Sequence, residues 1–197
     1  MSNSEAEWLQ KAIQGNDEAF TQLVEAYQKP VYNLCYRMLG DPLEAEDAAQ
    51  ESFWRAYQNL RRYDPQRSFI TWLLSIAAHF CIDQQRKRRL LIVPMEILPE
   101  EAVPDSSPNP EKVAGQKVED RRLHKLLGAM PSQDRAALVL RYWYDVSDQE
   151  IGQMLGMTVS AVKSRLHRAR KQLAISWQES EQNDPTPVKE EHGTPTF

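Results

Sequence analysis

Residues 147–173, SDQEIGQMLGMTVSAVKSRLHRARKQL, contain the pattern that decides the fold of this 197-residue sequence. The first four residues, SDQE, have the form of a capping box, in which the serine and the glutamate satisfy each other's exposed backbone amides at a helix start. Gly156 can adopt the left-handed conformation that ends such a helix, and Thr158 or Ser160 can cap another helix directly afterwards. The stretch therefore predicts a helix-turn-helix.

The second helix of this pair has two distinct faces. At 100° per residue its apolar side chains, from Val159 to Leu173, fall in one stripe that should pack inward. The opposite face is polar and basic, and it consists of Ser160, Lys163, Ser164, His167, Arg168 and Lys171. A basic amphipathic helix alone is more often a solvated surface. A basic helix that follows a capped helix and a glycine turn instead indicates DNA binding. In the major groove its cations meet phosphates, and its longer side chains reach base edges.

The charge distribution agrees with this prediction although the whole chain has a formal net charge of −4. Residues 121–173 carry 10 basic and 4 acidic groups, a net charge of +6. Residues 92–120 carry 2 basic and 7 acidic groups, and residues 174–197 carry 1 and 5. The positive charge is therefore concentrated where the helix-turn-helix lies, which is the arrangement that a nucleic-acid partner requires.

Three helices are predicted in the N-terminal half. Apolar residues at three- and four-residue spacing from Phe20 to Met38 predict a long helix, which Pro30 should kink. Asp41 is placed to cap a second helix that runs to about residue 60, and Ser68 to cap a third. No stretch of the chain alternates with period two over the length of a strand, so the predicted class is all-α.

Prolines and acidic residues divide the chain into parts. Residues 92–117 are predicted to be a flexible, acidic, Pro-rich linker, and residues 176–197 a disordered acidic tail. Between them, residues 118–175 form the predicted helix-turn-helix domain, with helices at about 113–130, 132–144, 147–155 and 159–177. Residues 1–91 form the other of two small helical domains.

The sequence does not indicate an enzyme. The four histidines lie in separate segments, none at metal-ligand spacing with another ligand type, and no Gly-rich phosphate loop or nucleophile turn occurs. Cys35 and Cys81 fall on apolar sides of helical patterns and are expected to be buried free thiols in a reducing cytoplasm. No apolar run is long enough to span a bilayer. We therefore expect a cytoplasmic protein with no catalytic residues, no cofactor, no metal and no membrane insertion.

A family resemblance extends this prediction. Residues 155–170, LGMTVSAVKSRLHRAR, together with Met130-Pro131 and Leu140-Arg141-Tyr142, resemble the last domain of extracytoplasmic-function (ECF) sigma factors. That family usually has Gly-Thr where this chain has Ser160-Ala161. The resemblance implies that the second helix of the pair reads the minus-35 promoter element. By alignment, the contacts fall on Lys163, Ser164, His167 and Arg168.

An acidic segment in the first domain carries a second part of the resemblance. Residues 44–53, EAEDAAQESF, place acidic and polar groups on one helical face, which in a generic protein is a solvated surface. The segment resembles the part of ECF sigma factors that docks on the clamp of the largest subunit of RNA polymerase. The resemblance implies that Asp47, Gln50 and Glu51 bind polymerase.

Aromatic residues and arginines alternate in residues 53–63, FWRAYQNLRRY, a composition suited to holding a separated DNA strand. Phe53 and Tyr57 are nevertheless expected in the core. The resemblance implies that the loop of residues 61–68 receives a base flipped out of the minus-10 element and that the next helix lies along the melted segment. The implied minus-10 contacts are Arg61, Arg62, Tyr63, His79, Asp83, Arg86 and Arg88.

Together these features predict a factor that binds core RNA polymerase and promoter DNA, both as duplex and as melted strand, and directs initiation at specialised promoters. Because members of the resembled family are often held inactive by an anti-sigma factor, such a partner is expected. Two alternatives remain. A stand-alone helix-turn-helix regulator would bind duplex DNA tightly without polymerase, and a polymerase-binding inhibitor would bind the enzyme without melting DNA.

Overall fold

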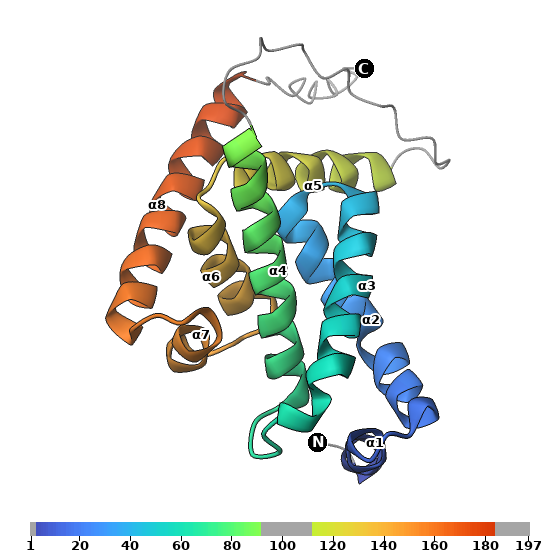
Figure 1. The fold of residues 1–197 in the computed structure, drawn as a ribbon. Helices are drawn as coiled ribbons and strands as arrows, with labels where there is room; N and C mark the ends of the chain where they lie inside the picture. The colour runs from blue at the N-terminus through green and yellow to red at the C-terminus, as the bar shows by residue number, and fades with distance from the viewer. Residues whose placement is uncertain (1–2, 92–111, 184–197) are drawn as a thin grey trace, which may run out of the picture.

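The structure, a computed structural model, describes residues 3–91 and 112–183. Within these ranges every regular element is a helix, which confirms the predicted all-α class (Figure 1). None of these helices is long and apolar enough to cross a membrane. The elements are α1 (Asn3–Ile13), α2 (Asp17–Leu39), α3 (Pro42–Asn59), the 3-10 helix η1 (Leu60–Arg62), α4 (Phe69–Leu91), α5 (Lys112–Gly128), α6 (Ser132–Trp143), α7 (Asp148–Leu155) and α8 (Val159–Asn183).

The first domain is built on α2, α3 and α4, which pack against one another. The start of α2 is capped by Asn16, whose side chain accepts a hydrogen bond from the Ala19 amide at 2.8 Å, and Asp41 caps α3 as predicted. Gly40, at φ +83°, ends α2. The helix continues without a break across Pro30. The sequence pattern did not predict α1, because its apolar residues span only about two turns.

The second domain contains the predicted helix-turn-helix in α7 and α8. The hydroxyl of Ser147 accepts a hydrogen bond from the Glu150 amide at 3.2 Å, and the Glu150 carboxylate accepts one from the Ser147 amide at 3.1 Å. The Ser147 hydroxyl also donates to the Glu150 carboxylate at 2.6 Å, and this bond, together with the one from the Ser147 amide, lowers the pKa of Glu150. Gly156 has φ +65°, and a Cβ atom at Gly152 would lie 2.8 Å from the Met157 carbonyl oxygen. The turn therefore depends on both glycines.

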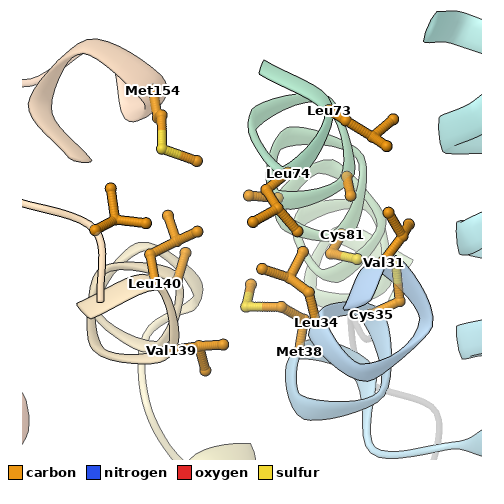
Figure 2. Close-up of a cluster of buried hydrophobic side chains, with 14 of the residues drawn as sticks. Val31, Leu34, Cys35, Met38, Leu73, Leu74, Cys81, Val139, Leu140 and Met154 are labelled. Atoms are coloured by element: carbon orange, nitrogen blue, oxygen red, sulfur yellow. The ribbon is translucent and has the colours of Figure 1, made fainter. Parts of the chain in front are cut away.

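The two domains pack together around a shared core. Helices α2 and α4 contact α6, and α4 also contacts α7. Figure 2 shows side chains of the first domain facing those of the second across this contact, among them Leu34, Met38 and Leu74 opposite Val139 and Leu140. The sequence pattern predicts two domains but does not predict that they share a core.

Polar contacts accompany this core. The buried guanidinium of Arg135 donates to the carbonyl oxygen of Met38 near the end of α2, where the helix dipole favours a cation. The Tyr144 hydroxyl donates to the carbonyl oxygen of Pro30 at 2.6 Å. Arg37 lies over the ring of Trp143 at 5.0 Å. Contacts between α2 and α6 therefore fix the relative placement of the domains.

Two of the predicted boundaries differ from the structure. Helix α5 begins at Lys112, so residues 112–117 are helical rather than linker, and α8 continues to Asn183, so residues 176–183 are helical rather than disordered. The remaining parts of the predicted linker and tail, residues 92–111 and 184–197, lie outside the described residues. Cys35 and Cys81 are free and buried, as predicted.

Candidate nucleic-acid interface

The outer face of α8 carries the basic surface predicted from the sequence for the second helix of the helix-turn-helix. Thr158 caps the helix, because its hydroxyl accepts a hydrogen bond from the Ala161 amide at 3.2 Å. Val162, Leu166 and Ala169 are buried, whereas Val159, expected to point inward, is 39% exposed. The predicted outward residues are all exposed: Ser160, Lys163, Ser164, His167, Arg168 and Lys171. The structure thus brings the whole predicted set onto one surface.

Three arginines along α8 differ in their surroundings. Arg165 turns toward α6 and donates to the carboxylate of Asp134 at 2.5 Å. Arg168 is exposed, with its Nε atom 4.0 Å from the other carboxylate oxygen of Asp134. Arg170 donates to the Tyr142 hydroxyl at 3.5 Å, a long contact at the surface. Among the residues of α8 that are predicted to contact DNA, Arg168 is therefore one that has a carboxylate nearby, that of Asp134.

The predicted acidic stripe on α3 divides between two sides of the helix. Asp47 and Gln50 are exposed, and Glu51 pairs with Arg55 at 2.7 Å on the same helix. Gln50 lines a hollow of about 590 Å³ between α2 and α3. Asp47 instead lines a smaller cavity of about 280 Å³ toward α4. The three residues are neighbours on α3 but do not converge on one pocket.

An apolar groove adjoins Gln50 and was not predicted from the sequence. It measures about 520 Å³ and is lined by Phe20, Trp54 and Tyr57, among others. Trp54 is 56% exposed, and its ring stacks on that of Tyr57 at 6.0 Å. The Tyr57 hydroxyl donates to Asp17 at 2.6 Å, so Tyr57 lies at the rim rather than in the predicted core. Phe53 is buried, as predicted. In the sequence, the only signal for this groove was the presence of Trp54 in a segment where aromatic residues alternate with arginines.

The segment that follows α3 needs one correction. Arg61 and Arg62 are exposed on the 3-10 turn, as expected of DNA contacts. Tyr63, by contrast, is only 5% exposed. Its ring lies 5.6 Å from Phe69 and 5.2 Å from Trp72, and its hydroxyl donates to the carbonyl oxygen of Arg67. Burial raises the pKa of this phenol. Tyr63 therefore anchors the loop and offers no free ring to a base.

On α4 the predicted minus-10 residues follow one side of the helix. His79, Asp83 and Arg86 are exposed, and a ring nitrogen of His79 lies 2.8 Å from the carbonyl oxygen of Ser75. Arg88 is different, because its guanidinium pairs with Glu44 of α3. Of these four side chains, only that of Arg88 takes part in an ion pair among the described residues.

The helix-turn-helix domain lies against the loop that follows η1. A polar cavity of about 270 Å³ is lined by Arg67 and Trp72 from the first domain and by Glu150 and Met154 from α7. Contacts between α4 and α7 form its walls. Sequence reasoning did not predict this neighbourhood, since packing between distant segments produces no local periodicity.

Comparisons with known proteins define the class. The Sigma-70 region 2 family matches residues 23–90, which include the acidic stripe and the loop after η1. The Sigma-70 region 4 family matches residues 120–173, which include α7 and most of α8. A region 2 domain followed by a region 4 domain is the arrangement of a sigma factor, so the protein is a transcription initiation factor that works with core RNA polymerase on promoter DNA.

Sequence relatives specify the family. The chain is 36% identical over 183 residues to the ECF RNA polymerase sigma factor SigW of Bacillus subtilis (strain 168), covering 84% of this chain and 92% of the relative. It is 36% identical over 157 residues to SigE of Mycolicibacterium smegmatis, covering 79% of this chain and 60% of that relative. The chain belongs to the ECF RNA polymerase sigma factors.

Solved structures show the same fold. CnrH in complex with the cytosolic domain of CnrY superposes with a TM-score of 0.67 at 24% identity, covering 90% of this chain and 99% of that one. The sigma factor RpoE of Bartonella quintana, in complex with the anti-sigma factor NepR, gives a TM-score of 0.63 at 18% identity, covering 81% and 96%. At these identities the likeness concerns the fold.

Proposed function

We propose that three surfaces of this sigma factor divide the work of initiation. The outer face of α8 reads the minus-35 element, the acidic and apolar surface of α3 docks on the polymerase clamp, and the loop after η1 holds the melted minus-10 strand. The observation that supports the proposal most strongly is the exposure of all the predicted basic and polar side chains on one face of α8.

The minus-35 proposal follows from the chemistry of the α8 face. Lys163, Arg168 and Lys171 supply cations that attract phosphates, and this attraction positions a helix in the major groove. His167 and Ser164 lie beside them on the same exposed face and present donors and acceptors that can pair with base edges. Of this face, we assign base reading chiefly to Arg168, since a guanidinium can form two parallel hydrogen bonds with guanine.

The docking proposal combines charge with apolar area. Asp47, Gln50 and Glu51 present the polar part, for which basic groups on the polymerase clamp are the complement. The neighbouring groove with Phe20 and the exposed Trp54 adds an apolar part, and buried aromatic side chains contribute much of the affinity of protein interfaces. We propose that polymerase covers both parts.

The minus-10 proposal rests on exposed cations beside a firmly held loop. Arg61 and Arg62 are available for the backbone of a separated strand, and His79, Asp83 and Arg86 continue the surface along α4. Tyr63 keeps the loop in shape by packing inside it. Extruding a base costs a few kcal/mol of unstacking, which a preformed loop can offset because it loses little entropy on binding.

The proposed roles require the two domains to separate on a promoter. The minus-10 and minus-35 elements lie about 25 base pairs apart, which is roughly 85 Å of duplex at ~34 Å per helical turn. A compact chain of this size has a radius of gyration of about 16 Å. The packed arrangement cannot reach both elements, so we assign it to the sigma factor away from DNA.

We further propose an anti-sigma factor as a partner, and the cytoplasm as the place of action because RNA polymerase and the chromosome are there. One structural neighbour, RpoE, was solved in complex with the anti-sigma factor NepR, and another, CnrH, in complex with the cytosolic domain of CnrY. For this chain the partner's identity would be found by its ability to block association with core polymerase.

Run-off transcription tests the proposal. Core polymerase with the full-length chain is expected to give discrete transcripts from particular promoters, whereas core polymerase alone gives none. Two other results would contradict it. Tight duplex binding without any effect on polymerase would indicate a stand-alone regulator, and binding to polymerase with transcription suppressed and no DNA opening would indicate an inhibitor.

A further inference from the structure

Asp134 places a single carboxylate between two arginines of α8. It lies in the first turn of α6, and its side chain is 9% exposed. One carboxylate oxygen accepts a hydrogen bond from Arg165 at 2.5 Å, and the other lies 4.0 Å from the Nε atom of Arg168. An acidic group of one helix therefore reaches the basic face of the helix next to it.

The two arginines are affected differently. Arg165 has a side chain only 27% exposed, and its direct bond to Asp134 fixes the guanidinium and neutralises its charge. Arg168 is three residues further along, so the two are neighbours on the helix surface. Its side chain is 63% exposed and attracted to the carboxylate without being held by a hydrogen bond. Arg168 remains able to meet DNA, whereas Arg165 does not.

We infer that Asp134 is a positioning residue for DNA reading. Its carboxylate keeps Arg165 away from the DNA phosphates, and from the α6 side it restricts the orientation of the Arg168 guanidinium. The inference rests on the proposed role of α8 at the minus-35 element. A free guanidinium binds any phosphate and so adds affinity without sequence preference. Withholding one cation and restricting another makes binding depend more on base edges, where orientation decides the contact.

Removing the charge of Asp134 tests this role. Asp134→Asn preserves the size of the side chain but removes the negative charge that holds Arg165. Affinity of the full-length chain is measured by fluorescence anisotropy over a range of KCl concentrations. The probes are a duplex selected by the wild-type chain from a random pool and a scrambled duplex of the same length.

The expected result is tighter but less selective binding. Once released, Arg165 contacts one more phosphate, so the slope of log K against log salt becomes steeper by about 0.9. The scrambled duplex gains affinity severalfold at low salt, and the ratio of selected to scrambled affinity falls. A role confined to holding the fold would not predict a gain of affinity.

Asp145→Asn is the matched control. It removes the same charge from the same domain, but the Asp145 side chain is fully exposed and lies 3.9 Å from Arg141. Asp145 follows the C-terminal end of α6, whereas Asp134 lies in the first turn of that helix. Its backbone has φ +49°, a conformation that asparagine tolerates well. The salt slope of this variant should equal that of the wild type. Equal changes of the salt slope in both variants would show that the effect comes only from the net charge of the protein, and would overturn the inference.

A second variant keeps the inference falsifiable if Asp134→Asn fails to fold, which thermal unfolding by circular dichroism would reveal. Arg165→Gln removes a cation that, according to the inference, does not contact DNA in the wild type. Its salt slope should stay unchanged, whereas Lys163→Ala should make the slope shallower by about 0.9. Equal losses in both variants would show that Arg165 contacts phosphate and would overturn the inference.

Arg168→Ala separates failure of this inference from failure of the proposed function. If it changes the affinity for neither duplex, α8 is not the reading face and the proposed function itself fails. If it weakens binding to the selected duplex while Asp134→Asn behaves like Asp145→Asn, the reading face stands and only the positioning role of Asp134 is wrong.

Discussion

Single side chains decide which parts of the promoter surface are available. Arg165 and Arg168 are the same residue type three positions apart on α8. Only Arg168 is exposed and outside hydrogen-bond distance of Asp134. Directly after η1, Tyr63 is turned inward, while Arg61 and Arg62 of η1 itself are exposed. The residue type alone does not separate these roles. Arginine occurs both in ion pairs and in DNA contacts, and tyrosine occurs both in cores and at binding surfaces.

Arg168→Ala is expected to weaken binding to the minus-35 element by about 1–3 kcal/mol, the usual contribution of an arginine that reads a base edge. Affinity for a duplex carrying the element measures the loss. Gln178→Ala, an exposed polar residue about 15 Å further along the same helix, is the control and should bind like the wild type. An unchanged affinity for Arg168→Ala would contradict the assignment.

Tyr63 is expected to act through stability rather than through stacking on DNA. Tyr63→Ala removes a buried ring and should lower the free energy of unfolding by about 3 kcal/mol. Tyr63→Phe loses only the hydrogen bond to Arg67, about 1 kcal/mol, and should open promoters as the wild type does. Thermal unfolding and permanganate footprinting report the two properties. A strong opening defect in a stable Tyr63→Phe variant would show that the phenol itself meets DNA.

At the scale of elements, the geometry of the helix-turn-helix depends on local features that can be read from the sequence. The capping box at Ser147 fixes the start of α7, and the left-handed Gly156 fixes its end. Close approach of the Met157 carbonyl to Gly152 then sets the angle at which α8 leaves the turn. Because these features are contiguous in the chain, the motif was predicted correctly.

Gly152→Ala tests the close approach in this turn. The added methyl would lie 2.8 Å from the Met157 carbonyl oxygen, a contact that neither backbone segment can avoid, so a loss of about 1–3 kcal/mol is expected in urea unfolding. Gly128→Ala is the control, because no atom lies within 4 Å of the added Cβ, and it should be nearly neutral. Equal stabilities for the two variants would show that the turn can relax around the methyl group.

Contacts between elements were much harder to predict than the elements themselves. The pair of Asp134 and Arg165 joins residues 31 positions apart, and neither side chain departs from the pattern of its own helix. Tyr63 belongs to a segment whose composition suits DNA contact, yet the nearby Phe69 and Trp72 provide an apolar site for its ring. Periodicity identifies the face of a helix but not the side chain that will cover it.

At the scale of the whole molecule, the packed domains limit which surfaces can act together. The outer face of α8 is exposed, but α7 lies against the loop proposed to hold the minus-10 strand. Tyr144 and Arg135 bind backbone carbonyls of α2, so both contacts must break when the domains separate. Polymerase binding can drive the separation if the clamp and the promoter bind the open form more tightly.

Acidic pH is expected to favour separation through His124, whose ring contacts that of Tyr36 across the domain boundary at 4.2 Å. Burial lowers the pKa of His124, and Arg37 of α2 and Arg135 of α6 lower it further, against the opposing effect of Asp120 on α5. The packed form thus binds a proton less readily than the separated form. The contribution of His124 to the stability of the packed form is complete above the ordinary histidine pKa, about 6.5, and is lost as the pH falls below that value.

Small-angle X-ray scattering of the free chain measures this effect as a rise in the radius of gyration as the pH falls from about 8 to about 5.5, a range that brackets the ordinary histidine pKa. His124→Gln should show a smaller rise, while His79→Gln, a change at an exposed histidine, should behave like the wild type. An identical rise in all three proteins would place the titrating group elsewhere.

The central claim is that one chain reads two promoter elements with two separate surfaces, and start-site sequencing tests it most directly. Holoenzyme containing the wild-type chain transcribes a template library with random upstream sequence, and the active templates should share one motif near minus 35 and another near minus 10. With Arg168→Ala, the account predicts that the minus-35 motif loses information while the minus-10 motif stays. Loss of both motifs together, or of neither, would contradict it.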